Sequence, residues 1–194
     1  MHIEFLVEEP STEVALNFIV PKIIGDTHTL KIHNFQNKDR LLKRLTERMK
    51  SYANFVHDDL RIVIIVDEDR TDCQELKRKL CDASSFVTKH KGNIVLHRIA
   101  VEELESWFLG DVTAIRAEYE KIPVSLSQQA KFRNPDTIKG GTWEQLDKIL
   151  KKYGYKTGLQ KIYFAEKVSP HMDVENNLSK SFQVFRDGLR NIVK

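Results

Sequence analysis

The sequence predicts an α/β protein in which a mostly parallel sheet carries helices on both faces and is followed by a helical C-terminal section. Through about residue 110, apolar stretches of strand length alternate with stretches of helical periodicity, which is the order of a parallel sheet with crossover helices. From residue 112 to residue 194 helical patterns continue, broken by proline and glycine, and no convincing strand follows. We therefore divide the chain into an α/β domain, 1–110, and a helical section, 111–194, packed on it.

The first two elements are a strand at 2–7 and a helix after it. The helix should bury Leu16 and Phe18 and end at Pro21 or at Gly25. Both residues are frequent at helix ends, proline because it interrupts the hydrogen bonding and glycine because it tolerates the left-handed conformation.

The next elements are a strand at 29–33, a helix and the central strand at 61–66. Asn37 can cap the helix, since asparagine is among the preferred N-cap residues. Four apolar residues recur in it at helical spacing: Leu41, Leu42, Leu45 and Met49. The central strand is a run of mainly β-branched residues, which is typical of a strand buried on both faces of a parallel sheet.

The α/β domain should end with a helix, a fourth strand and the start of another helix. Thr71 and Gln74 have the spacing of a capping box that opens the first of these helices. The fourth strand is expected at 93–100, and the last helix at 102–109.

The composition is that of an ordinary globular protein, with 41% hydrophobic and 30% charged residues in 194. No stretch approaches the roughly 20 apolar residues of a spanning helix, and the N-terminus lacks a signal-peptide pattern. Cys73 and Cys81 would lie about 12 Å apart on one helix, too far for a disulfide. We therefore expect a cytoplasmic protein that does not engage a membrane.

Charge is unevenly distributed along the chain. Residues 1–120 contain 17 Lys and Arg against 21 Asp and Glu, whereas residues 121–194 contain 14 against 7. An acidic part joined to a basic part suits a protein that binds metal with one and a polyanion with the other. Solvated faces of C-terminal helices explain the basic excess at least as well.

Acidic residues follow the expected ends of three strands: Glu8, then Asp67 and Asp69, then Glu102, Glu103 and Glu105. Because the carboxyl ends of parallel strands share one edge, these acids should converge on one crevice. Crowded carboxylates repel one another unless a cation lies among them, and Mg²⁺ or Mn²⁺ is the usual candidate. Asp69 could instead cap the next helix.

A cluster of this kind favours phosphoryl transfer, in which metal ions bind phosphate oxygens and activate water. A carboxylate that is not used as a ligand can take the proton from that water. Other chemistries lack their motifs: there is no GxxxxGK[ST] of an ATPase, no HExxH or paired Cys/His spacing for zinc, and no GxSxG nucleophile elbow.

At these residues the chain resembles a Toprim domain, the metal-binding fold of topoisomerases, primases and OLD-type nucleases. Glu8 matches the acid that follows the first Toprim strand, with Glu9 in place of the usual glycine, and Asp67-Glu68-Asp69 matches the DxD motif. The resemblance covers roughly residues 1–110. We favour Glu8 over Glu9 as the operative acid, because Glu8 directly follows the strand.

A closer resemblance is to an uncharacterised Toprim-like family of prokaryotic proteins, domain of unknown function family 4276. It rests on the acid-rich strand end at 66–69, on the E-x-W-[FL]-L-x-D segment at 105–111, and on a later Tyr-to-Lys segment at 153–156. The resemblance implies that Glu105 and Asp111 are further acids of the site. It also implies a cytoplasmic prokaryotic protein whose gene often lies beside an ABC-type ATPase in mobile-element or phage-defence loci.

We therefore expect a nuclease that cleaves phosphodiesters of DNA or RNA with Mg²⁺ or Mn²⁺ and has an ABC-type ATPase partner. Its expected metal ligands are Glu8, Asp67, Asp69, Glu105 and Asp111. Glu8 could also be the general base. Lys156, with Arg70 as a second cation, would neutralise charge on the scissile phosphate.

Several alternatives stay open. Asp111 could equally be the N-cap of the following helix, and Lys156 an ordinary solvated lysine. The chain could be a non-catalytic Toprim-like module that binds a partner ATPase or nucleic acid, or an effector that acts on tRNA or nucleotides. The sequence leaves the oligomeric state open, a homo-oligomer included.

Overall fold

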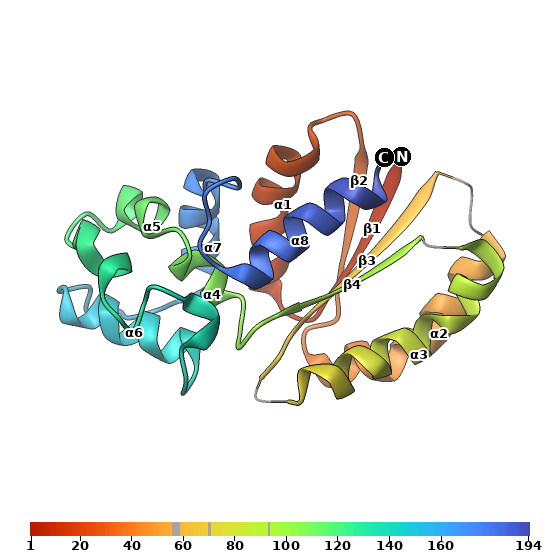
Figure 1. Cartoon of the computed structure of the whole chain (residues 1–194), viewed down its shortest axis with the longest axis horizontal. Coiled ribbons are helices and arrows are strands. Elements are labelled where there is room, and N and C mark those ends of the chain that lie inside the picture. The colour runs from red at the N-terminus through yellow and green to blue at the C-terminus, as the bar shows by residue number, and fades with distance from the viewer. Residues whose placement is uncertain (56–58, 70, 93) are drawn as a thin grey trace.

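The computed structural model describes residues 1–55, 59–69, 71–92 and 94–194. Strands and helices alternate in its first part (Figure 1), as the sequence predicts: β1 His2–Val7, α1 Pro10–Ile24, β2 Thr29–Asn34, α2 Lys38–Phe55, β3 Leu60–Asp67, α3 Cys73–Lys91 and β4 Val95–Ala100. Helices follow, with short 3-10 helices (η) among them: α4 Glu105–Leu109, α5 Val112–Glu118, η1 Val124–Gln128, η2 Pro135–Thr137, α6 Thr142–Lys152, α7 Lys161–Val168, η3 Ser169–His171 and α8 Lys180–Ile192.

The four strands form one parallel sheet in the order β2-β1-β3-β4. The chain runs from β1 outward to β2 and then crosses to β3 on the other side of β1. The direction of winding therefore reverses between β1 and β3, which are hydrogen-bonded neighbours with Val7 opposite Ile65. In open α/β sheets, ligands bind outside the carboxyl ends of the strands at such a switch point.

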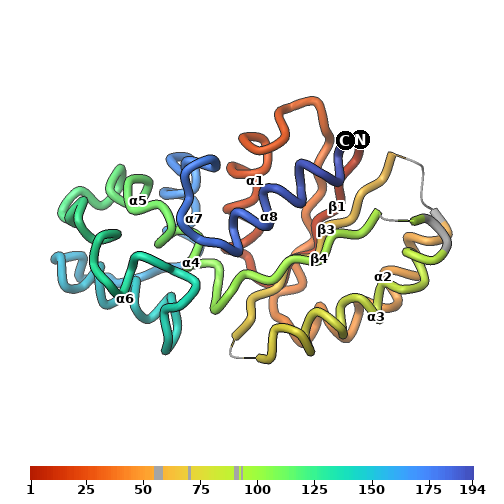
Figure 2. Tube along the Cα trace, in the orientation of Figure 1, coloured from red at the N-terminus to blue at the C-terminus, as the bar shows by residue number. Residues whose placement is uncertain are grey.

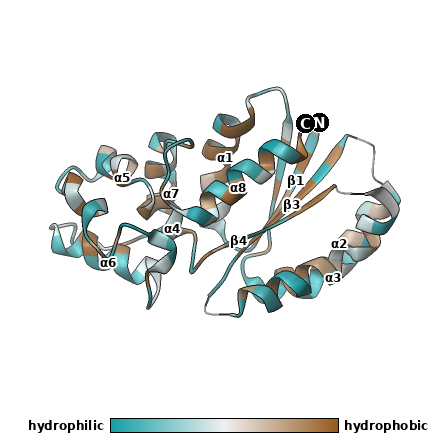
Figure 3. Cartoon of the chain, in the orientation of Figure 1, coloured by the Kyte–Doolittle hydropathy of each residue, from teal (hydrophilic) through white to brown (hydrophobic). Residues whose placement is uncertain are grey.

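Helices cover both faces of this sheet (Figure 1). α1 and α8 pack on one face, and α2 and α3 pack on the other. The central strand β3 is apolar on both sides, and its residues from Ile62 to Val66 are at most 1% exposed. Figure 3 shows the same pattern, with hydrophobic strands between helices whose outer faces are hydrophilic. The predicted α/β class with a parallel sheet is confirmed.

The C-terminal section is helical, as predicted, and its last helix returns to the sheet. Figure 2 shows α8 running beside α1 and back toward the N-terminus. Arg98 Nε of β4 donates a hydrogen bond to the Val184 carbonyl at 3.0 Å. Trp107 of α4 stacks on Phe185 of α8 with ring centroids 4.9 Å apart. The division of the chain at residue 110 stays a prediction. None of the described helices is long and apolar enough to cross a membrane.

Two predicted helix starts are wrong. α3 is capped by Asp72, whose Oδ1 accepts from the Glu75 amide at 2.7 Å, and not by Thr71. α4 begins at Glu105 and not at Glu102, because Glu102 has φ of 60°, in the left-handed region outside a helix. The acids after β4 therefore lie partly on a loop.

Smaller differences concern α1 and β4. α1 continues through Pro21 and ends at Gly25, so the second of the two expected ends is correct. Phe18, which was expected to be buried, is 37% exposed. β4 starts at Val95, and Asn93, the expected first residue of that strand, lies outside the described residues.

Candidate active site

Three carboxylates from different strand ends are buried together at the carboxyl edge of the sheet. Glu8 directly follows β1, Asp67 is the last residue of β3, and Glu105 is the first residue of α4, after β4. Their exposed fractions are 3%, 3% and 2%. A Glu8 carboxylate oxygen accepts a hydrogen bond from the Asp67 backbone amide. We call these three residues the acid triad, and they lie at the switch point between β1 and β3.

Burial is the main influence on the proton affinity of Glu8. The pKa of this carboxyl group is raised to about 7, mainly by burial and to a smaller extent by the charges of Asp69 and Glu9. The hydrogen bond from the Asp67 amide and the charge of Lys38 act in the opposite direction. Glu8 therefore titrates close to neutral pH, where a carboxylate can both accept and release a proton.

The other two acids are shifted in the same direction. Burial raises the pKa of Asp67 well above its usual value, and the neighbouring charges of Glu8 and Glu105 add to this. Burial raises the pKa of Glu105 to about 7, while Lys161 acts to lower it. Strong perturbation of adjacent acids by burial and by one another is typical of functional sites.

Lys161, the first residue of α7, brings a cation to the triad. Its Nζ lies 3.9 Å from Glu105 Oε1 and 3.2 Å from Glu9 Oε2. Burial tends to lower its pKa, but Glu105, Glu9 and Asp67 together raise it above the usual lysine value. Glu9 is thus the acid that pairs with lysine, whereas Glu8 is the one buried against Asp67.

Asp69 lies beside the triad but is much more accessible. Its side chain is 50% exposed, and its Oδ2 is 2.8 Å from Nζ of Lys38. Together with Glu102, Glu103 and Gly141 it lines a small cavity of about 240 Å³. The triad itself does not line this cavity, so a ligand in it would meet Asp69 first.

Glu102 and Glu103 have structural contacts of their own. Glu103 Oε2 accepts hydrogen bonds from Thr142 Oγ1 at 3.1 Å and from the Trp143 amide at 2.8 Å, at the start of α6. The Glu102 amide donates to Glu68 Oε2 at 3.1 Å. These bonds hold the loop after β4 against the start of α6.

The structure places Asp111 away from the triad. Its Oδ1 accepts from the Ala114 amide at 3.0 Å and its Oδ2 from the Asp173 amide at 2.7 Å. Its charge acts on Lys22, which is about 18 Å along α1 from the helix start next to Glu8. Asp111 is therefore the N-cap of α5, the alternative that its sequence context left open.

Of the two cations expected from the sequence, only Lys156 lies among the described residues, and it does not contact the acids. Lys156 is exposed, between α6 and α7, and makes no hydrogen bond or ion pair with an acid among the described residues. Arg70 lies outside the described residues. Within the described part of the chain, the lysines that contact these acids are Lys161 and Lys38. No motif marks them in the sequence, and the only signal for Lys161 is the basic excess of residues 121–194.

The donor atoms of the triad suit a hard divalent cation. All are carboxylate oxygens, which Mg²⁺ and Mn²⁺ prefer, and the buried Glu105 Oε2 has no hydrogen-bond partner. Within the described part of the chain, however, no group of three or more His, Cys, Asp or Glu side chains is arranged to hold a metal ion. Binding would therefore require rotation of these side chains toward a common point.

The family described as Domain of unknown function (DUF4276) matches residues 7–190. This covers the triad, both lysines and nearly all of the helical section, so the chain belongs to this family. No curated protein and no solved structure matches it. The relation to the Toprim domains of OLD-type nucleases stays a prediction.

Proposed function

We propose that this protein is a metal-dependent phosphodiester hydrolase that cleaves nucleic acid with Mg²⁺ or Mn²⁺. The observation that carries the proposal is the burial of Glu8, Asp67 and Glu105 together at the switch point of the sheet. Three carboxylates buried together cost folding free energy near neutral pH, although the charges of Lys161 and Lys38 offset part of this cost. A cluster that costs stability at the place where α/β proteins bind ligands is best explained by function.

Each residue has a role that its position supports. A bound divalent cation would supply positive charge to the phosphate and make a water molecule more acidic. Asp67 and Glu105 would hold the cation, with Asp69 able to join from the accessible side. Glu8, with its pKa near 7, would take the proton from the attacking water.

Lys161 takes the role that the sequence had suggested for Lys156. Its ammonium group, paired with Glu9 and Glu105, can move toward a phosphate oxygen once a cation neutralises the acids. Lys38 holds Asp69 at the mouth of the site. Both lysines thereby offset the negative charge that the acids would otherwise present to an anionic substrate.

The substrate, the partner protein and the biological role are part of the same proposal. DNA or RNA as the substrate is supported by the basic excess of residues 121–194. An ABC-type ATPase partner and a role in phage defence or on mobile elements are supported by the resemblance to Toprim-like proteins. The proposed function is compatible with a homo-oligomer.

A cleavage assay tests the hydrolase. Wild-type protein, Asp67→Asn and Asp72→Asn would be incubated with single-stranded DNA, duplex DNA and RNA in Mg²⁺, Mn²⁺ or EDTA. Asp72→Asn is the matched control, because Asp72 caps α3 and asparagine is an equally good cap. We expect divalent-dependent cleavage by wild type and Asp72→Asn and a loss of at least about 100-fold in Asp67→Asn. Equal activity of all three proteins would refute the assignment.

A non-catalytic module that binds an ATPase or nucleic acid is the second candidate. It is favoured by the absence, among the described residues, of a group of acids arranged to hold a metal. Isothermal titration of folded protein with Mg²⁺ and with Mn²⁺ separates the two functions. Binding that is lost in Asp67→Asn supports the hydrolase, and no binding of either ion supports the module.

A further inference from the structure

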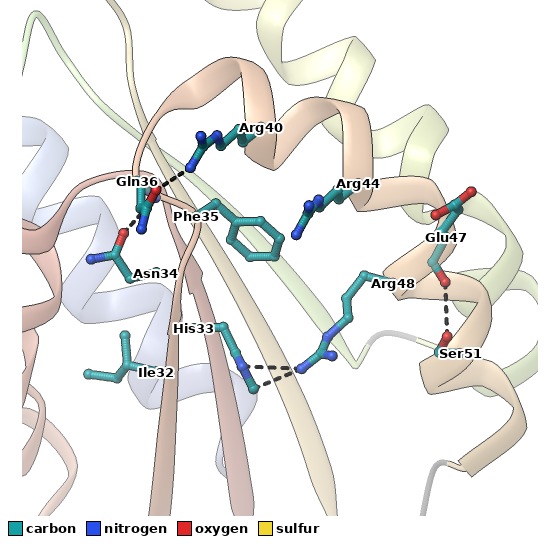
Figure 4. A pocket seen from close by; sticks show the side chains of 10 residues that line it. All are labelled: Ile32, His33, Asn34, Phe35, Gln36, Arg40, Arg44, Glu47, Arg48 and Ser51. Carbon is teal, nitrogen blue, oxygen red and sulfur yellow. Dashed lines mark hydrogen bonds between the residues drawn. The ribbon is translucent and has the colours of Figure 1, made fainter.

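A row of arginines lies along the side of α2 that borders the end of β2 (Figure 4). Arg40, Arg44 and Arg48 recur every four residues and therefore share one face of the helix. With the end of β2 they line an open cavity of about 830 Å³ (Figure 4). Eight residues of helix place the row over about 12 Å. Among the described lining residues Glu47 is the only acid, so the groove carries a net positive charge.

Arg48 is fixed by contacts with the rest of the fold, whereas Arg40 and Arg44 are accessible to a ligand. Arg48 donates to His33 Nδ1 at 3.2 Å and lies over the Tyr52 ring, and His33 Nε2 contacts the half-buried Glu4 carboxylate. Arg40 donates to the side-chain oxygen of Gln36. Arg44 makes no hydrogen bond or ion pair within the described part of the chain, and both Arg40 and Arg44 are exposed.

An aromatic ring lies in the same groove. Phe35 follows β2, and its ring lies between the strand and Arg44 (Figure 4). The ring is half-buried, since it also packs against the core beneath α2, and its remaining surface lines the cavity. Aromatic rings beside a line of cations are a combination by which proteins bind single-stranded nucleic acid, with bases stacked on rings and phosphates paired with cations. Arginine suits phosphate because its planar fork donates two parallel hydrogen bonds.

The groove leads to the acid triad. The Phe35 amide donates to the Val7 carbonyl at 2.9 Å, and Val7 directly precedes Glu8. At the start of α2, Lys38 pairs with Asp69 at 2.8 Å. One end of the arginine row is therefore two residues from a lysine that already contacts the site.

We propose that the groove between α2 and β2 binds the phosphate backbone of a single-stranded nucleic acid and guides it toward the acid triad. At about 12 Å the row is long enough to contact more than one phosphate of a single strand. Guidance to the triad rests on the proposed function, whereas binding in the groove does not. An acidic peptide would also pair with arginines, but Phe35 and the continuity with the triad favour a nucleic acid.

Anisotropy of a labelled single-stranded oligonucleotide, as DNA and as RNA, tests the proposal in EDTA, where cleavage is absent. Arg40→Gln/Arg44→Gln removes two charges from the groove. Lys43→Gln/Lys50→Gln is the matched control, because both lysines are exposed on α2 outside the lining of the groove. Arg48 is left intact, since its bonds to His33 and its contact with Tyr52 tie it to the fold.

We expect the arginine pair to bind about 25-fold more weakly at 0.1 M salt, since each lost contact with a single strand lowers the salt slope by about 0.7. The lysine pair should lose roughly threefold or less, because its charges lie outside the groove and are screened. Equal losses in both pairs, or no binding by wild type, would overturn the proposal. Competition by polyglutamate as strong as by unlabelled oligonucleotide would also overturn it, in favour of an acidic peptide.

The same assay separates this site from the hydrolase. Asp67→Asn leaves the groove untouched and should bind the oligonucleotide at least as well as wild type. If the double arginine variant binds weakly while no protein cleaves in Mg²⁺ or Mn²⁺, the binding groove is supported and the proposed hydrolase is refuted. If wild type cleaves and the double arginine variant binds as wild type does, the hydrolase is supported and the binding groove is refuted.

Discussion

Replacing Glu105 by glutamine should stabilise the protein at pH 8 and have little effect at pH 5. Burial raises the pKa of the Glu105 carboxyl to about 7 in the folded protein, from an ordinary value of 4.5. At a pH between these two pKa values, Glu105 is protonated in the folded protein but has released its proton in the unfolded chain. Stability therefore falls as the pH rises from about 4.5 to about 7, and the loss is complete above that window.

The size of the effect follows from the same two values. At about 1.4 kcal/mol per tenfold change in proton affinity, ionised Glu105 costs about 3 kcal/mol at pH 8. Only a small part of this cost is present at pH 5. Relative to Glu105→Gln, the wild type should therefore lose about 2–3 kcal/mol between pH 5 and pH 8, or roughly 4–12 °C in Tm for a chain of this size.

Urea and thermal unfolding of both proteins in EDTA at the two pH values measures this difference. Any cost of fitting an amide into the site is the same at both pH values and cancels in the comparison. Glu166→Gln, exposed on α7, is the control and should stay within about 0.5 kcal/mol of wild type throughout. If wild type and Glu105→Gln lose equal stability between pH 5 and pH 8, Glu105 does not titrate as a buried acid and the reasoning fails.

Two further predictions concern the cations of the site. Adding Mg²⁺ or Mn²⁺ should raise Tm more at pH 8 than at pH 5, since protons compete with metal for the acids. Differential scanning calorimetry measures this rise. An equal rise at both pH values, or an equal rise in wild type and Asp67→Asn, would contradict the prediction. Lys161→Met should cost about 1–3 kcal/mol at pH 8 and less at pH 5, because it leaves Glu105 and Glu9 without their cation. Urea unfolding measures this loss of stability. The loss caused by Lys161→Met should largely disappear when Glu105→Gln is already present, and additive effects of the two substitutions would show that the two side chains are not coupled.

Most of the α/β part was predictable because its signals are local. The run of apolar residues at 62–66 can only be satisfied by a strand with neighbours on both faces, and β3 is that strand. Asn37 caps α2 as expected, with its Oδ1 accepting from the Arg40 amide at 2.9 Å. Failures occurred where two neighbouring residues could serve equally well: Asp72 caps α3 in place of Thr71.

The acids were predictable as a group because topology alone brings them together. Strand ends of a parallel sheet share an edge, so Glu8, Asp67 and the acids after β4 had to lie near one another. Which acid after β4 enters the group was not decided by topology. The left-handed turn at Glu102 and the short helix α4 direct Glu105 inward and leave Glu103 to cap α6.

The sequence by itself therefore determined the parallel sheet and the edge at which its carboxylates gather, since both depend on hydrophobic periodicity and chain order. Only the tertiary structure decided which charges meet there. Lys161 reaches Glu105 from 56 residues along the chain, and Asp111 turns instead to the Asp173 amide. Arg44 and Phe35 line the same cavity because α2 packs on a face of the sheet beside its edge strand β2. Contacts between distant elements depend on how helices pack, and no local pattern encodes that.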